Sequence, residues 1–245
     1  MVDPKTITTA LMVLTACTSS VDSASLRQIH PSEGLSLLRQ GRTSEARARL
    51  EHERSMGSRN PHVAWGLGRV YAMEGLSSLA RKEYERALLI RESMPEAEMD
   101  LAALDYDEGN TAACLERLER LTPNDIVLWN RCLAHLKSRD AASALVCSRL
   151  LVDQSPEKAA HWELHGLTAL ACGERTEARL AFERLLKIQP DNVCAQGNLE
   201  GLKRPGTEAT GPTRDFAFLD AVGASGWLRT AISIPGDRAR TRSGP

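Results

Sequence analysis

The sequence predicts an all-α chain built from repeated antiparallel helical hairpins, and two observations support this prediction. Leu, Ala, Glu and Arg dominate the 245 residues, aromatic residues make up only 4%, and the Val, Ile and Thr enrichment typical of strands is missing. Turn and packing residues also recur at intervals close to 34 positions. A fixed period of this length is typical of stacked helical repeats.

Four registers define the repeat. The turn register holds Gly41, Gly75, Gly109, Asp140 and Gly173, with Asp140 at a position where glycine is expected. Small residues expected on the second helix are Ala46, Ala80, Cys114, Ala144 and Ala178. Four positions later stand Leu50, Tyr84, Leu118, Ser148 and Phe182. Small residues expected on the first helix are Gly34, Gly68, Ala102, Leu133 and Gly166. Each unit is therefore expected to be a helix, a turn and a second helix whose backbone packs closely on the first.

Prolines mark the expected boundaries between units, because proline cannot continue a helix. These prolines are Pro61, Pro95, Pro123, Pro156 and Pro190. The third unit is expected to end its second helix early, at Pro123, which explains the shorter interval that follows it. The array is expected to cover residues 27–203, as about five units and a closing helix at 193–203.

One unit carries a family resemblance with particular clarity. Residues 159–192 resemble the tetratricopeptide repeat consensus at Trp162, Gly166, Gly173, Ala178, Phe182 and Pro190. The resemblance implies that the hairpins stack into a right-handed superhelical solenoid with a concave groove lined mainly by first helices. It also implies that the function is binding of a protein or peptide partner.

Five positions of each tetratricopeptide unit point into that groove, by the same resemblance. Here they include His62, Trp65, Arg69, Met73, Met99, Tyr106, Asn130, Lys137, Glu163 and Leu167. Trp65, Met73, Met99 and Tyr106 are expected to form an apolar strip in neighbouring units, with Arg69 and Asp107 at its rim. The alternative is that Trp65 and Tyr106 only pack between adjacent units.

The N-terminus resembles the signal sequence of bacterial lipoproteins. Lys5 precedes a short apolar run at 7–14, and Leu14-Thr15-Ala16-Cys17 resembles the lipobox. The resemblance implies a signal peptide at 1–16, cleavage between Ala16 and Cys17, and lipidation of Cys17. The polar residues 17–26 would form a flexible tether. The expected location is the bacterial envelope, at the outer membrane facing the periplasm. The alternative is a cytoplasmic leader.

The combination of lipobox and repeats is similar to that of Tad-type pilus assembly lipoproteins and type IV pilus pilotins. This similarity implies a lipid-anchored scaffold that assists assembly of a pilus or secretion system, with secretin or pilus components as candidate partners. The alternative function is that of a soluble cytoplasmic adaptor or regulator without lipidation.

Neither an enzyme nor a nucleic-acid-binding protein is indicated. The formal net charge is −1 and the basic residues alternate with acidic ones, so no basic stripe is expected. GxSxG, P-loop and HExxH motifs are absent from the sequence. His161 and His165 have a spacing that can chelate a metal, but Glu163 between them does not make a zinc-protease motif. We therefore expect no catalytic residues, no metal and no cofactor.

Six cysteines show no CxxC pair, and those inside helical patterns are expected to be small buried residues. A Cys132–Cys147 disulfide is left open by the sequence.

Residues 204–245 form a Gly-, Pro- and Arg-rich tail with apolar segments at 215–222 and 225–234. This tail is expected either to cap the last helix, which is the favoured interpretation, or to bind a partner.

Overall fold

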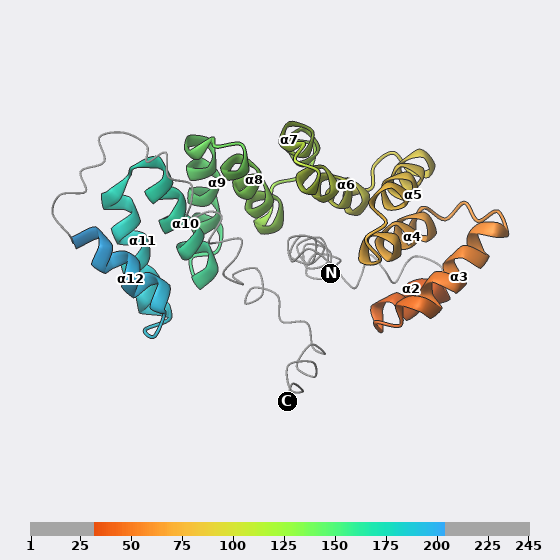
Figure 1. The fold of residues 1–245 in the computed structure, drawn as a ribbon, viewed down its shortest axis with the longest axis horizontal. Coiled ribbons are helices and arrows are strands. Elements are labelled where there is room, and N and C mark those ends of the chain that lie inside the picture. The colour runs from red at the N-terminus through yellow and green to blue at the C-terminus, as the bar shows by residue number, and fades with distance from the viewer. Residues whose placement is uncertain (1–31, 204–245) are drawn as a thin grey trace, which may run out of the picture. The chain divides into compact units, whose positions relative to one another are not determined.

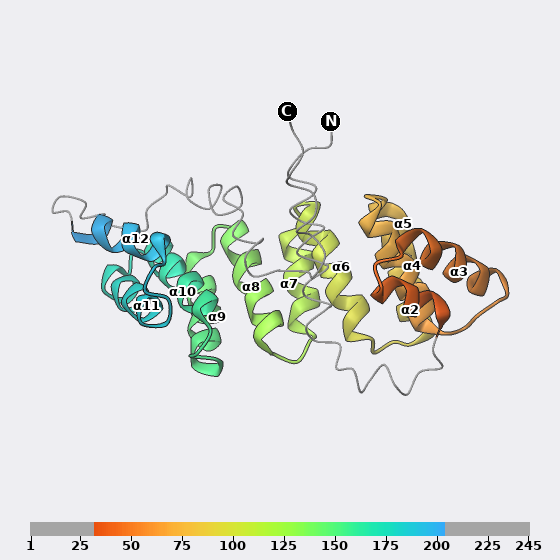
Figure 2. The same ribbon diagram turned by 90° about the horizontal axis from the view of Figure 1, so that it is seen from below.

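A computed structural model of the chain describes residues 32–203, and every regular element among them is an α-helix (Figures 1 and 2). The predicted all-α fold class is therefore confirmed. The helices are α2 (Glu33–Arg39), α3 (Thr43–Ser55), α4 (Pro61–Met73), α5 (Ser77–Ile90), α6 (Pro95–Asp107), α7 (Thr111–Glu119), α8 (Asp125–Lys137), α9 (Ala141–Gln154), α10 (Ala159–Cys172), α11 (Arg175–Ile188) and α12 (Val193–Lys203). The predicted signal peptide, Cys17, the tether and the tail lie outside the described residues.

The helices pair into five hairpins followed by α12, in the order expected for the repeat. The chain divides into two compact units, Met1–Thr122 and Pro123–Pro245. The described part of the N-terminal unit holds α2 to α7, and that of the C-terminal unit holds α8 to α12. The division falls just before Pro123, and α7, the helix that precedes it, is short, with 9 residues, and ends at Glu119.

Four of the five hairpin turns use glycine with a positive φ, as predicted. Gly41, Gly75, Gly109 and Gly173 have φ between 75° and 85°, a region that side chains with a Cβ reach only with strain. In the fourth hairpin this position is held by Arg139, with φ 63°, and not by Asp140. The assignment of Asp140 to the turn register is therefore wrong by one residue.

Asp140 has a different role, at the N-cap of α9. Its side chain accepts a hydrogen bond from the backbone N–H of Ser143 at 3.0 Å. Asp is a strong N-cap residue because its carboxylate satisfies a backbone donor that the first helical turn leaves without an intrahelical partner.

The same one-residue shift applies to the first helix of the fourth hairpin. α6 and α8 both have 13 residues, and each residue of α8 is equivalent to the residue of α6 that lies 30 positions earlier. Cys132, and not Leu133, therefore occupies the small-residue position equivalent to Ala102. Cys132 is fully buried, and its thiol donates to the backbone carbonyl of Ala144 at 3.5 Å. The close contact between first and second helix is thus kept with cysteine in place of glycine or alanine.

The size of the first-helix residue is matched by its partner on the second helix. A Cβ on Gly68 would lie 2.5 Å from the Tyr84 ring, and one on Gly166 would lie 2.7 Å from Phe182. Both aromatic rings are fully buried. The third hairpin pairs the larger Ala102 with the smaller Leu118 at the equivalent positions. In these three hairpins a larger residue on one helix is therefore matched by a smaller one on the other, whereas the first hairpin packs Gly34 against Leu50.

Pro61 and Pro95 are the first residues of α4 and α6, where a missing N–H has no consequence for the helix. The other three boundary prolines, Pro123, Pro156 and Pro190, lie in connections between helices, as expected.

The cysteines of the described residues are all free thiols. Cys114, Cys132 and Cys147 are buried, which confirms their predicted packing role, whereas Cys172 and Cys194 are half-buried. The disulfide that the sequence left open between Cys132 and Cys147 is not formed. None of the helices between residues 32 and 203 has both the length and the apolar character needed to cross a bilayer.

Candidate functional site

The first helices of the N-terminal unit form a continuous row, because α2 contacts α4 and α4 contacts α6 (Figure 1). This row carries the predicted groove residues of the unit, and we call its surface the first-helix face. Met73, at the end of α4, is 39% exposed. Tyr106, near the end of α6, is half-buried, and Asp107 beside it is exposed. Met73 and Tyr106 are thus the residues of the predicted strip that are accessible to a partner, and Asp107 is an accessible residue of its predicted rim.

Trp65 and Asp100 lie beneath that surface and join α4 to α6. The indole Nε1 of Trp65 donates to a carboxylate oxygen of Asp100 at 2.8 Å. Trp65 is 4% exposed and Asp100 is fully buried. The Arg69 guanidinium stacks over the Trp65 ring, 5.2 Å from its centroid. Trp65 therefore packs between adjacent first helices, which is the structural alternative that the sequence left open for it.

His62 and Met99 are also buried in this row. The His62 ring meets Trp65 edge-on, with the ring centroids 6.3 Å apart. Burial, assisted by the charge of Arg91, lowers the pKa of His62, so this histidine stays neutral near pH 7. These two residues support the first-helix face from below.

Burial also affects Tyr106. Desolvation, together with the charge of Asp107 and a smaller effect of Cys114, raises the pKa of Tyr106 to about 12. The phenol is therefore protonated at neutral pH and presents a neutral amphipathic ring at the end of α6. Such a ring suits the binding of a mixed apolar and polar partner.

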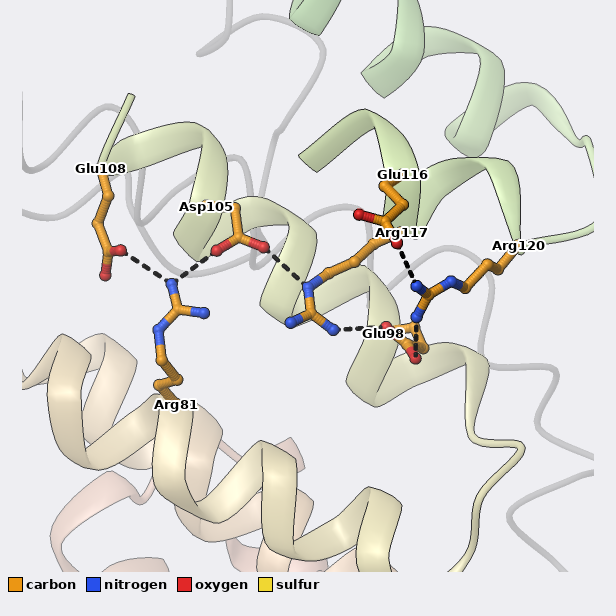
Figure 3. A network of polar contacts seen from close by, with 7 residues as sticks. All are labelled: Arg81, Glu98, Asp105, Glu108, Glu116, Arg117 and Arg120. Carbon is orange, nitrogen blue, oxygen red and sulfur yellow. Dashed lines mark hydrogen bonds and ion pairs between the residues drawn. The ribbon is translucent and has the colours of Figure 1, made fainter. Parts of the chain in front are cut away.

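A polar network on the other side of α6 joins it to the second helices (Figure 3). The buried Asp105 accepts hydrogen bonds from Arg81 on α5 and Arg117 on α7, both at 2.8 Å. Arg117 also donates to Glu98 at 2.9 Å, so one arginine bridges two carboxylates of α6. The network fixes α5, α6 and α7 relative to one another. We therefore assign this network a structural role, because Arg81 and Arg117, the two cations that contact Asp105, both connect neighbouring helices.

In the C-terminal unit the predicted groove residues differ in how exposed they are. Lys137 is exposed and Asn130 is half-buried, whereas Glu163 and Leu167 are 8% and 4% exposed. Helix bounds place Trp129, and not Asn130, at the fifth position of its helix, equivalent to Trp65 and Met99.

Trp129 is the site residue that the sequence reasoning missed. It is half-buried, and its ring lies 6.0 Å from that of His161 on α10. The interval of 30 residues between Cys114 and Ala144 was the signal that could have located it, because 30 residues after Met99 is Trp129. Trp129 gives the C-terminal unit an aromatic residue on its own first-helix face.

Glu163 connects α10 to the start of α12. Burial raises the pKa of Glu163 to about 6, and hydrogen bonds with Cys194 and Asn192 act in the opposite direction. The same contact and burial raise the pKa of the Cys194 thiol to about 12, so the thiol remains protonated and donates. Glu163 is therefore a groove-position residue whose carboxylate is used within the fold.

Ser148, His165 and Glu177 form a cluster that superficially resembles a hydrolytic triad. Ser148 Oγ lies 3.0 Å from His165 Nδ1, and His165 Nε2 lies 3.2 Å from Glu177 Oε1. The imidazole nitrogens are reversed relative to a Ser-His-Asp triad, in which Nε2 faces the serine. Ser148 is fully buried and also contacts Thr168 Oγ1 at 2.7 Å. A substrate has no access to this hydroxyl, and the cluster joins α9, α10 and α11.

The histidine pair considered as a metal chelate is likewise used in packing. His161 Nδ1 lies 3.2 Å from the Leu151 carbonyl oxygen, while both nitrogens of His165 face the residues just described. Burial lowers the pKa of both histidines. Between residues 32 and 203 no group of three or more His, Cys, Asp or Glu side chains is arranged to hold a metal ion.

These hairpins, turns and packing registers define a helical-repeat fold of the tetratricopeptide type. Residues 32–97 match the tetratricopeptide repeat family model. A comparison with curated proteins finds no match.

Solved structures with the same fold include several tetratricopeptide proteins. One is YrrB, described as a TPR protein with an unusual peptide-binding site, with a TM-score of 0.59, 18% identity, and coverage of 68% of this chain and 88% of YrrB. Another is MamA, with a TM-score of 0.59, 17% identity, and coverage of 66% and 97%. PilF of Pseudomonas aeruginosa has a TM-score of 0.60 and 15% identity, and the match covers 95% of this chain and 94% of PilF. At these identities the similarity establishes the fold.

Proposed function

We propose that this chain is a protein-binding scaffold, anchored by lipid on Cys17 to the outer membrane, that assists assembly of a pilus or secretion system from the periplasmic side. Secretin or pilus-assembly components are the proposed partners. The observation that carries the binding function is the first-helix face, where Met73, Tyr106 and Asp107 are accessible above a rigid layer formed by Trp65 and Asp100.

A rigid layer favours binding because little side-chain freedom is lost when a partner docks on it. Trp65 is held by its hydrogen bond to Asp100 and by the stacked Arg69 guanidinium, so the surface above it is preorganised. Apolar contact with Met73 and the Tyr106 ring would supply affinity, and the Asp107 carboxylate would select a partner with a basic group. This arrangement suits an amphipathic helix or extended peptide that carries one Lys or Arg.

Two further observations support the location and the system. The lipobox-like Leu14-Thr15-Ala16-Cys17 follows a short apolar run, which is the order of an exported lipoprotein leader. The structural match to PilF extends over nearly the whole of both chains. The alternative function is that of a soluble cytoplasmic adaptor, in which the leader is neither cleaved nor acylated.

Intact-mass measurement and membrane fractionation of the chain expressed in a Gram-negative host test the anchor. The proposal requires a product that begins at Cys17, carries acyl chains and sediments with outer membranes. Cys17→Ser should move it to the soluble fraction. An unprocessed Met1 form, or a Cys17→Ser variant that fractionates like the wild type, contradicts the anchor and favours the adaptor.

The binding function is tested separately with the soluble array, residues 27–245, immobilised and exposed to periplasmic extract from the source organism. A Met73→Glu/Tyr106→Ala double variant should retain less of the specific partner, at least about tenfold less if each side chain contributes roughly 1 kcal/mol. Lys82→Ala and Glu116→Ala on the second helices serve as exposed control variants. Equal recovery of partner by all variants contradicts a site on the first-helix face.

A further inference from the structure

Three aliphatic side chains extend into solvent from the second helices of the C-terminal unit. Val146 and Leu150 on α9 are 53% and 45% exposed, and Leu180 on α11 is 55% exposed. Arg149 on α9 and Glu177 on α11 form a bidentate ion pair at 2.7 and 2.6 Å, which holds the two helix faces side by side. We call the three aliphatic residues the second-helix patch.

The repeat itself shows that these positions do not need apolar residues. Val146 and Leu180 are equivalent, since each lies two residues after the buried alanine of its second helix. In the three hairpins of the N-terminal unit the same position holds Ala48, Lys82 and Glu116. The position of Leu150 is held in the other four hairpins by His52, Arg86, Arg120 and Arg184. Exposed aliphatic residues at positions where the other hairpins mostly carry polar or charged residues indicate a surface that is covered by another segment.

The end of the array, α12 (Val193–Lys203), carries one strongly exposed apolar side chain, Val193, which is 79% exposed. Leu199 and Leu202 of α12 pack inward against the Phe182 cluster of the C-terminal unit. Side chains on the opposite side of α12, at Gln196 and Glu200, are polar and exposed. A covering segment that carries aromatic residues therefore gains more from the second-helix patch than from α12.

The tail contains a segment whose composition matches the patch and its rim. Residues 215–220 read DFAFLD, and they include two of the three phenylalanines of the chain between two aspartates. Leu180 has Arg179 and Arg184 beside it on α11, and Lys187 lies one turn beyond Arg184. The carboxylates nearest to Leu180, Glu177 and Glu183, are paired with Arg149 and Arg179. The two aspartates of the tail segment therefore match the α11 side of the patch, and not the α9 side, where Asp153 is exposed.

The tail is long enough to reach this surface. α12 ends at Lys203 and packs against α11. Phe216 follows 13 residues later, and a chain of that length spans up to about 43 Å when extended. The 14-residue helix α11 is only about 21 Å long. Phe216 can therefore meet Leu180 without any displacement of α12.

We propose that residues 215–220 dock on the second-helix patch of the same chain, with Phe216, Phe218 and Leu219 against Val146, Leu150 and Leu180 and the two aspartates beside the α11 cations. This contact uses second helices of the C-terminal unit, whereas the proposed partner-binding residues lie on first helices of the N-terminal unit, so the two sites share no residue. The tail then covers the side of the last hairpins and not the end of the array.

Site-specific photo-crosslinking of the full chain tests the proposal, with benzoylphenylalanine in place of Phe218. The expected product is an intramolecular crosslink to peptides of α9 or α11 in the monomer. The double variant Val146→Lys/Leu180→Lys places lysine at both positions, which is the residue that the second hairpin carries at the equivalent position, Lys82. It should reduce this crosslink at least about fivefold, since about 1 kcal/mol of apolar contact corresponds to that factor.

Lys82→Leu in the N-terminal unit is the matched control and should leave the crosslink unchanged. The urea unfolding midpoints of all variants are measured as well. They should equal that of the wild type, because the substituted positions are exposed. Crosslinks to α12 or to the first-helix face, crosslinks only between two copies of the chain, no crosslink at all, or a crosslink that survives the double lysine variant would each overturn the proposal.

Discussion

The indole nitrogen of Trp65 donates a hydrogen bond to Asp100, at 2.8 Å, between two successive first helices of the N-terminal unit. Both side chains are buried, so the bond lies beneath the first-helix face and not at its surface. A residue that the repeat pattern assigns to partner contact therefore acts in the packing of adjacent repeats. The bond joins α4 to α6, the two helices that carry Met73 and Tyr106.

Trp65→Phe should destabilise the N-terminal unit by about 1–3 kcal/mol, because the buried Asp100 carboxylate loses this donor while most of the apolar ring contact is kept. Asp100→Asn should have a smaller effect, because the amide oxygen still accepts the bond. Urea-induced unfolding followed by circular dichroism measures both. A Trp65→Phe variant as stable as the wild type would show that the bond contributes nothing net.

Gly68→Ala should destabilise by about 1–3 kcal/mol, because the new Cβ lies 2.5 Å from the buried Tyr84 ring and the core must shift. Adding Tyr84→Leu should recover part of the loss, since the third hairpin already packs Ala102 against Leu118 at these positions. Gly197→Ala on α12, where nothing lies within 4 Å, is the control and should stabilise by up to about 1 kcal/mol. Additive losses in the double variant would contradict the volume-matching account.

Arg139→Gly should stabilise the C-terminal unit by about 1 kcal/mol, because glycine adopts a φ of 63° without the strain that a Cβ imposes. Asp140→Gly should destabilise by a few tenths of a kcal/mol, because the N-cap bond to Ser143 is lost. Thermal unfolding of the two variants separates the two positions. The opposite order of stabilities would restore Asp140 to the turn register.

The fold could be predicted from the sequence because the repeat is specified several times over by backbone geometry. Gly41, Gly75 and Gly109 each mark a turn that needs positive φ, and the registers agree wherever this glycine is present. The prediction failed by one residue where glycine is replaced by Arg139, because a neighbouring Asp is also a turn-forming residue. That single error displaced Leu133 and Asn130 from the positions held by Cys132 and Trp129.

The candidate site was harder to predict, because a repeat position gives the direction of a side chain but not what covers it. Met73 and Trp65 were assigned to the same strip, yet Met73 is 39% exposed and Trp65 is 4% exposed. Met73 is the last residue of α4, whereas Trp65 lies further inside that helix and its indole is hydrogen-bonded to Asp100 of the next repeat. Such a bond between side chains 35 residues apart has no signature in the local sequence.

Glu163→Gln should stabilise the C-terminal unit at pH 7.5 and have little effect at pH 4. The folded pKa of Glu163, about 6, lies above the ordinary value of 4.5, so ionisation disfavours the folded state. The penalty is complete above pH 6 and disappears below pH 4.5, and its size corresponds to about 2 kcal/mol at most. Urea unfolding at the two pH values measures the difference, with Glu183→Gln as an exposed control. A variant with equal effects at both pH values would contradict the burial of a charged Glu163.

In-cell photo-crosslinking from single sites tests the scaffold function most directly, with the full chain produced in its source organism. Benzoylphenylalanine at Met73 or Tyr106, on the first-helix face, should give one discrete adduct with an envelope assembly protein. The same probe at Lys82 or Glu116, on exposed second-helix positions, should not give that adduct. Adducts of equal yield from both sets of positions, or none from Met73 and Tyr106, would contradict binding through the first-helix face.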